Sequence, residues 1–138
     1  MVLAETTSTN SVALERASDP GADGLVVVAD FQTAGRGRLG RSWQAPRGAS
    51  LLFSALLTQD LPESADPGEH ASPAGRLTLL AAVAACEAVR AATEITPAIR
   101  WPNDLRIGRR KLGGILVESR QIPARGRAWV VGIGINCL

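Results

Sequence analysis

The apolar run Leu25-Val26-Val27-Val28-Ala29 leads into the loop Thr33-Ala34-Gly35-Arg36-Gly37-Arg38-Leu39-Gly40-Arg41, and these two segments decide the fold. The apolar run predicts a strand, and the glycines of the loop let backbone N–H groups approach a ligand closely. The arginines supply planar guanidinium groups that suit carboxylate or phosphate oxygens. A strand that feeds such a loop is typical of a site for an anionic small molecule at a sheet edge. Taken alone, the loop is also compatible with a solvated turn or an RNA-binding segment.

Lysine usage is the second informative feature of the sequence. Of the 15 basic residues, 14 are arginine and only Lys111 is lysine. It stands in Lys111-Leu112-Gly113-Gly114-Ile115-Leu116. A chain so biased toward arginine is expected to keep lysine where a compact ammonium must fit a tight site beside glycines. The alternative is a surface hairpin at which the lysine has no role.

Length and composition exclude several classes of protein. With 138 residues, 46% of them hydrophobic and 20% charged, the chain is expected to form one soluble globular domain. No apolar run approaches the roughly 20 residues that span a bilayer, and the N-terminus does not resemble a signal peptide. A net charge of +2 is too small to predict a nucleic-acid partner. Cys86 and Cys137 are far apart and predict no disulfide framework, so we expect a cytoplasmic protein.

Histidine chemistry is not expected either. The only histidine, His70, lies in Asp60–Gly75, a stretch rich in Pro, Ser, Glu, Asp and Gly that is typical of a surface excursion. A Ser-His-Asp triad or a histidine-rich metal site is therefore not predicted, and two cysteines cannot form a structural zinc site. We expect no metal site built from side chains of this chain.

Hydrophobic periodicity and turn residues predict an α/β (α+β) fold in which helices flank a mixed β-sheet. The first helix has Asn10 or Ser8/Thr9 as its expected cap. The first two strands are apolar enough to predict burial on both faces. The predicted helices are Ser8–Ala17 and Gly75–Thr93, and the predicted strands are Leu25–Asp30, Ser50–Leu57, Ala98–Trp101, Leu105–Ile107, Gly114–Ser119 and Ala128–Ile135.

Polar residues between these elements fall into five ordered segments. They are Glu5–Asn10, Gln32–Arg41 with Trp43, Arg100–Asp104, Lys111–Leu116 with Glu118, and Gly132–Asn136. In this order and spacing they resemble the catalytic domain of biotin protein ligases (biotin–[biotin carboxyl carrier protein] ligases). The resemblance runs from about Glu5 to Asn136 and implies a biotin/lipoate ligase-like fold related to class II aminoacyl-tRNA synthetases.

The resemblance implies a reaction in two steps. The carboxylate of biotin attacks the α-phosphorus of ATP to give biotinyl-5′-AMP, and a lysine of the biotin carboxyl carrier protein then attacks this mixed anhydride. Such chemistry needs neutralised charge and aligned reactants more than a protein nucleophile. Arg38 and Lys111 are the expected catalytic residues, and Mg²⁺ is expected on the triphosphate.

The resemblance also implies the binding residues, position by position. The residues expected to bind biotin are Ser8, Thr9, Asn10, Gln32, Gly35, Arg36, Gly37, Arg38, Lys111, Gly113 and Gly114. Those expected to bind ATP are Arg38, Arg41, Trp43, Asn103, Lys111 and Asn136. The loop around Arg36 is expected to be mobile until ligand orders it.

For three of these segments the sequence leaves other roles open. Ser8–Asn10 suits a helix cap as well as a ligand wall, and Trp43 suits the core as well as adenine stacking. Asp104 suits a partner for Lys111 or Arg38, or the start of a turn.

The chain also departs from the family pattern. It stops at Leu138, whereas the resemblance implies a further helix and strand and a C-terminal β-barrel domain. We therefore expect residues 1–138 to be a catalytic domain that is incomplete at its C-terminus. No helix-turn-helix segment precedes Met1, so no repressor role is expected. The expected partners are biotin, ATP and the carrier protein, with neither nucleic acid nor membrane, and the oligomeric state stays open.

Three alternative functions remain at this point. A lipoate–protein ligase shares the fold and the adenylation step, although Gly-Arg-Gly-Arg with Trp-Pro-Asn-Asp favours biotin. A non-catalytic fragment would bind biotin or its adenylate without completing transfer. Nucleic-acid binding through the arginines ranks last, because only 4% of residues are aromatic.

Overall fold

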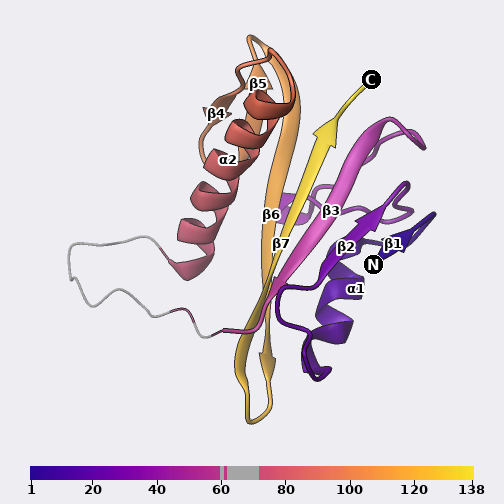
Figure 1. Ribbon diagram of the computed structural model, residues 1–138, viewed down its shortest axis with the longest axis vertical. Helices are drawn as coiled ribbons and strands as arrows, with labels where there is room; N and C mark the ends of the chain where they lie inside the picture. The colour runs from indigo at the N-terminus through magenta and orange to yellow at the C-terminus, as the bar shows by residue number, and fades with distance from the viewer. Residues whose placement is uncertain (60, 62–71) are drawn as a thin grey trace.

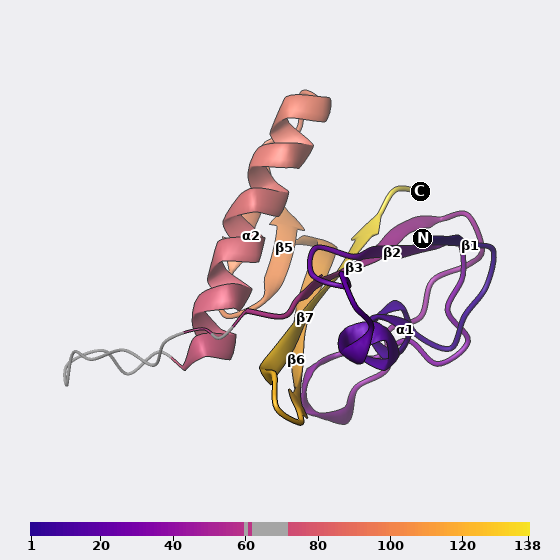
Figure 2. The same ribbon diagram turned by 60° about the horizontal axis from the view of Figure 1, so that its bottom comes forward.

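The computed structural model describes residues 1–59, 61 and 72–138, which form a seven-stranded sheet with a helix on each face (Figures 1 and 2). The strand order is β1-β2-β3-β7-β6-β5-β4, with β1 and β2 parallel and all other neighbours antiparallel. The predicted mixed sheet flanked by helices is confirmed. The strands are β1 (Val2–Leu3), β2 (Val26–Ala29), β3 (Ser50–Leu57), β4 (Ala98–Arg100), β5 (Asp104–Ile107), β6 (Arg110–Ile122) and β7 (Gly126–Asn136). The helices are α1 (Thr9–Glu15) and α2 (Pro73–Ala92), with 3₁₀ turns η1 (Arg16–Ser18) and η2 (Arg38–Gly40).

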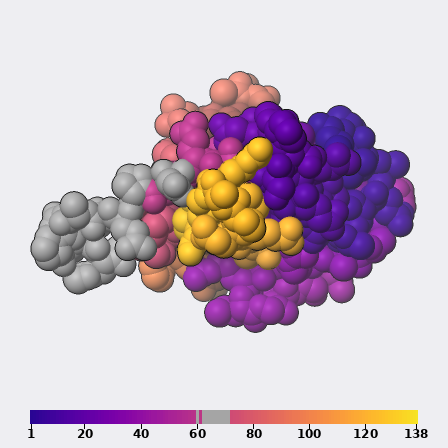
Figure 3. Space-filling view, turned by 90° about the horizontal axis from the view of Figure 1, so that it is seen from below, coloured from indigo at the N-terminus to yellow at the C-terminus, as the bar shows by residue number. Residues whose placement is uncertain are grey.

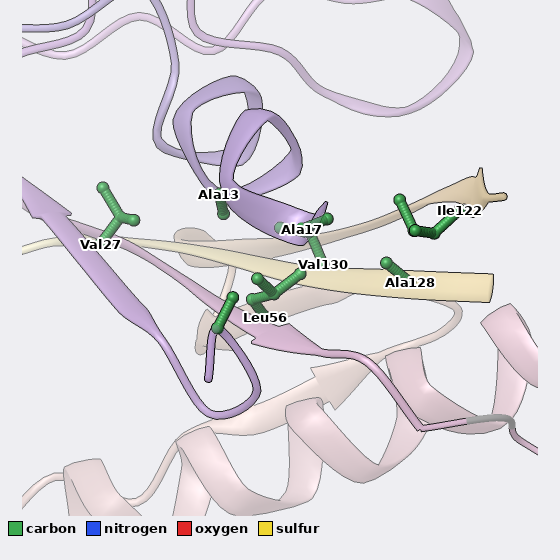
Figure 4. Packing of buried hydrophobic residues seen from close by; sticks show 8 residues of the cluster. Ala13, Ala17, Val27, Leu56, Ile122, Ala128 and Val130 are labelled. Atoms are coloured by element: carbon green, nitrogen blue, oxygen red, sulfur yellow. The ribbon is translucent and has the colours of Figure 1, made fainter. Parts of the chain in front are cut away.

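One face of the sheet is covered by α1, which places the N-terminal polar segment over the central strands. Ala13 of α1 and Ala17 of the following turn η1 are buried in one apolar cluster with Val27, Leu56 and Val130 of the sheet (Figure 4). Small side chains on the helix let its backbone approach the strands closely. A helix of seven residues is not stable alone, so this packing is what holds α1 in place.

The opposite face carries α2, which begins two residues before the predicted start. Its N-cap Ser72 accepts a hydrogen bond from the backbone N–H of Gly75, and Pro73 occupies the first turn, where its missing N–H costs nothing. Leu77 and the buried alanines of α2 pack against a second apolar cluster that includes Leu105 and Trp129. The two helices thus bury alternate residues of the same strands.

The hairpin formed by β6 and β7 is longer than the sequence predicted. Pairing continues from Gly113↔Ile135 to Ile122↔Gly126, well beyond the predicted Gly114–Ser119. Arg120, Gln121 and Arg127, among the missed residues, are polar and exposed, so they separate the buried Ile122 from the apolar run of β6 although the backbone stays paired. Arginines of this hairpin donate to backbone carbonyls at the end of α1 and in η1, and the two segments lie side by side in Figure 3.

The expected burial of β2 and β3 on both faces is wrong. In β3, Leu52, Ser54 and Leu56 are buried, but the alternate residue Leu51 is 44% exposed; in β2, Val26 is 43% exposed. The reason is that α2 packs against β4, β5, β6 and β7, which leaves the outer face of β2 and β3 more open. An antiparallel sheet tolerates such one-sided burial.

Three further observations concern predictions made from composition. Within the described part of the chain, no helix is both long enough and apolar enough to cross a membrane. Cys86 and Cys137 are free thiols, the first half-buried in α2 and the second exposed. Burial raises the pKa of the Cys86 thiol. His70 lies outside the described residues.

Candidate active site

A cavity of about 320 Å³ opens on the α1 face of the sheet and collects segments from all five polar motifs. Its floor is formed by β6 and β7, and its sides by the start of α1, the loop Gln32–Trp43 and the segment Arg100–Asp104. The sequence-predicted residues that line it are Ser8, Thr9, Asn10, Gln32, Arg36, Gly37, Arg38, Arg41, Trp43, Asn103, Lys111 and Gly114. The cavity lining does not include Gly35, Gly113 or Asn136.

The first wall of the cavity is polar yet almost fully buried. Ser8, Thr9 and Asn10 are 3–4% exposed. Gln32 Oε1 accepts from the backbone N–H of Thr9 over 2.7 Å and lies 3.0 Å from the Thr9 hydroxyl oxygen. Ser8 occupies the N-cap position of α1, but its side chain makes no capping hydrogen bond. The helix-cap alternative therefore does not account for the polar side chains here.

Two residues that complete this wall were missed by sequence reasoning. Ser54 of β3 is fully buried, and its hydroxyl lies 2.7 Å from Thr9 Oγ1 and 2.6 Å from Asn10 Oδ1. Gly132 of β7 lies directly under Asn10, where a Cβ would collide with the amide. The signal for Ser54 was a hydroxyl within the apolar run of β3. Gly132 belongs to the final motif, and its alternation with Gly134 along the strand was the signal for a strand surface without side chains at the bottom of a cavity.

The arginines of the glycine-rich loop contact other parts of the cavity. Arg36 makes a two-point contact with Glu118 of β6, over 2.9 Å from Nη2 and 3.3 Å from Nε, and its Nη1 donates to Ser11 over 2.8 Å. Arg38 Nη1 lies 3.4 Å from Asn103 Oδ1. Gly35, in the same loop, packs against the backbone of Trp43, and a Cβ at this position would come within 2.5 Å of the Trp43 carbonyl oxygen.

Trp43 is both packed and part of the cavity lining. Its ring lies on the sheet above Gly134, where a Cβ would approach the indole to 2.7 Å. Glycine is required at this position because any side chain would displace the ring. The indole Nε1 is buried and finds no acceptor among the described residues. Both roles that the sequence left open, core packing and a place at the ligand, are therefore compatible with the position of Trp43.

Lys111 lies at the cavity with a carboxylate and an aromatic ring beside it. Its Nζ is 2.7 Å from Asp104 Oδ1 and 5.4 Å from the centre of a Trp43 ring. Asp104 begins β5, and its contact is with Lys111, one of the roles that the sequence left open. Asn136 lies behind Lys111 and donates from Nδ2 to the Lys111 carbonyl over 3.3 Å. Gly113 pairs with β7 so closely that a Cβ would come within 2.6 Å of the Gly134 oxygen.

The comparison with protein families decides the identity. The model of the biotin/lipoate A/B protein ligase family matches residues 2–136. The chain belongs to this family. The cavity described above collects residues from all five polar segments that carry the resemblance to this family.

Similar proteins carry biotin ligase names. The chain is 42% identical over 129 residues to the bifunctional ligase/repressor BirA of Bacillus spizizenii, covering 94% of this chain and 37% of that protein. It is 38% identical over 140 residues to the biotin–[acetyl-CoA-carboxylase] ligase of Mycobacterium tuberculosis, covering 98% and 48%. A biotin protein ligase from Aquifex aeolicus, solved in complex with biotin and ATP, matches with a TM-score of 0.73 at 34% identity, covering 99% and 51%. The chain thus spans between about a third and a half of these relatives' lengths.

Proposed function

We propose that this domain activates biotin with ATP to biotinyl-5′-AMP and transfers biotin to a lysine of a biotin carboxyl carrier protein. The single observation that carries the proposal is the juxtaposition, in one cavity, of a buried polar wall at one side and Arg38 with Lys111 at the other. The names of the relatives support the same substrates. The polar wall fits recognition of the biotin ring, and the basic side fits the adenylation step.

The polar wall fits a ligand that brings its own N–H donors. Ser54 and Thr9 each carry one hydroxyl proton, yet three oxygen–oxygen contacts link Asn10 Oδ1, Ser54, Thr9 and Gln32 Oε1. Two protons cannot satisfy three contacts, so the wall has a surplus of acceptors. The ureido ring of biotin carries two N–H groups, whereas the dithiolane ring of lipoate carries none. The wall therefore favours biotin over lipoate.

The basic side of the cavity fits the adenylation step. A carboxylate oxygen of biotin attacks the α-phosphorus, and the bond to the β-phosphate bridging oxygen breaks to release pyrophosphate. The attacking and attacked groups are both negative, so a fixed cation between them lowers the barrier. Lys111, held by Asp104, and Arg38 are placed to supply that charge. Mg²⁺ would be held by the triphosphate oxygens.

The remaining roles follow from position in the cavity. Ser8, Thr9, Asn10 and Gln32 face the ureido ring, and Arg36, Gly37 and Arg38 cover biotin and its adenylate. Gly114 brings β6 close to the ligand. Gly35 and Gly113 act from outside the lining, by letting the loop pack against Trp43 and β6 pack against β7. Arg41, Trp43 and Asn103 lie on the nucleotide side, and Asn136 supports the backbone of Lys111. The transfer step releases AMP as the carrier lysine takes the acyl group, in the cytoplasm.

Isothermal titration of the chain with biotin and with lipoate tests the ligand assignment. We expect biotin to bind more tightly than lipoate. Thr9→Val, which removes the hydroxyl without changing side-chain shape, is expected to weaken biotin binding by about tenfold, the typical value of one buried hydrogen bond. Thr7→Val, at an exposed position of the same segment, is the matched control. Tighter binding of lipoate would overturn the proposal.

A further inference from the structure

We propose that Glu118 is a positioning residue that ties the glycine-rich loop to the polar wall and sets the hydrogen-bonding polarity of that wall. The inference deepens the proposed function and rests on it where biotin is concerned. Glu118 lies on β6, and its side chain is 28% exposed. One carboxylate receives donors from two segments of the cavity that are far apart in sequence.

The first segment is the loop. Arg36 approaches Glu118 with Nε and Nη2 facing the two carboxylate oxygens, the geometry in which guanidinium and carboxylate groups bind most specifically. The third nitrogen, Nη1, donates to Ser11 in α1. All three guanidinium nitrogens are thus engaged away from the loop itself. Arg36 therefore fixes the loop to both β6 and α1.

The second segment is the start of α1. Asn10 Nδ2 donates to Glu118 Oε2 over 2.7 Å and lies 3.3 Å from the Leu116 carbonyl. Since a carboxylate only accepts, the amide nitrogen of Asn10 must face Glu118 and its oxygen must face Ser54. Ser54 then donates to Asn10 Oδ1 and can only accept from Thr9.

These donor directions determine which atoms of the wall act as hydrogen-bond acceptors at the cavity. When the Thr9 hydroxyl donates to Ser54, Thr9 Oγ1 and Gln32 Oε1 lie 3.0 Å apart with no hydroxyl proton between them. Two acceptors then face a ligand N–H. A glutamine at 118 would present an amide NH₂ to Arg36 or Asn10, both of which are donors, so the Asn10 amide would be held in this orientation by the longer contact with the Leu116 carbonyl alone or by a neutral acceptor. The Glu118 carboxylate is therefore the shorter-range of two acceptors, with the Leu116 carbonyl, that turn the Asn10 oxygen toward Ser54 and make the wall an acceptor surface.

The test measures two properties of Glu118→Gln in the complete chain. One is the affinity for biotin by titration calorimetry, and the other is hydrogen–deuterium exchange of the loop amides in the chain without ligand. We expect about tenfold weaker biotin binding, the value of a lost charge-assisted hydrogen bond, and several-fold faster exchange in the loop. Arg120→Gln is the matched control, because it lies two residues further along β6 on the same face and is expected to change neither property.

A second variant separates positioning from folding. Arg36→Lys keeps the cation but loses the two-point contact, so it should speed exchange in the loop while the bond between Glu118 and Asn10 persists. Its loss of biotin affinity should therefore be smaller than that of Glu118→Gln. If Glu118→Gln does not fold, unchanged loop exchange in Arg36→Lys overturns the inference.

The inference and the proposed function fail in different ways. Wild-type chain that does not bind biotin contradicts the proposed function, and loop exchange in the variants still decides whether Glu118 ties the loop. Wild-type chain that binds biotin, together with Glu118→Gln that binds it equally well with unchanged loop exchange, overturns the role of Glu118 alone.

Discussion

Lys111 shows how individual residues are prepared for their proposed role in this cavity. Its ammonium is held by Asp104 and lies near the Trp43 ring, while its backbone carbonyl accepts from Asn136. The side chain stays 43% exposed, so the cation is positioned without being withdrawn from the cavity mouth. Such a charge suits a transition state in which negative oxygens are forced together.

Replacing Lys111 should affect the rate of adenylation more than ground-state binding. We expect Lys111→Ala to slow adenylate formation about a hundredfold or more, the typical cost of losing one transition-state charge contact of on the order of 3 kcal/mol, with a smaller effect on biotin affinity. Lys111→Arg should restore only part of the rate, because its wide planar group does not replace a compact ammonium beside Gly114. Equal losses in affinity and rate, measured by calorimetry and pyrophosphate release, would contradict this role.

Several site residues could be predicted from the sequence because they stand out from its overall composition. A single lysine among arginines and glycines crowded into one loop are unusual, and the structure places both at the cavity. Ser54 could not be predicted in the same way, and Glu118, although it belongs to the fourth polar segment, could not be given a role. Each is an ordinary residue in a strand, and its importance comes from partners more than 40 positions away that only the folded sheet brings near.

At the scale of elements, one side-chain contact fastens the end of β3. Asp23, in the turn before β2, accepts from the backbone N–H of Thr58 over 2.7 Å and from Gln59. The backbone hydrogen bond from Thr58 holds the pKa of Asp23 below its usual value of 3.8. The charged form is therefore favoured in the folded chain more than in the unfolded one.

This contact predicts how stability depends on pH. Because the folded pKa is lowered, the stabilisation is fully present above the unfolded pKa and is lost as pH falls below about 4 through the folded pKa. We expect Asp23→Asn to be less stable than wild type at pH 7 and to show a smaller loss of stability on acidification, in chemical denaturation at a series of pH values. Asp19→Asn, whose carboxylate pairs with the exposed Arg16, is the control. A difference between wild type and Asp23→Asn that stays constant across this range would contradict the assignment.

Elements with a hydrophobic period were predictable, and those without one were not. The helix over Pro73–Ala92 and the strand over Ser50–Leu57 follow the sequence pattern almost to the residue. By contrast, β1 has two residues and is stabilised by pairing with β2, which leaves no local signal. Burial of β2 and β3 was mispredicted because side chains alone do not show how far α2 extends across the sheet.

At the scale of the whole molecule, the sheet separates two tasks. The face under α2 is filled by an apolar cluster, whereas the α1 face combines an apolar cluster with glycines and polar residues that leave room for a ligand. On the α1 face, the packed core ends and the cavity floor begins at Gly132 and Gly134 of β7. The packed α2 face therefore supports the sheet from one side, and the open floor on the α1 face holds the proposed reactants on this rigid support.

The most direct test of the account is pyrophosphate release by this chain with ATP and biotin, with biotinyl-5′-AMP detected by mass spectrometry. We expect adenylate formation that requires both substrates, is slowed about a hundredfold or more in Lys111→Ala, and does not occur when lipoate replaces biotin. Adenylate formed at equal rates from biotin and lipoate, or no adenylate from wild-type chain that binds both biotin and ATP, would contradict it.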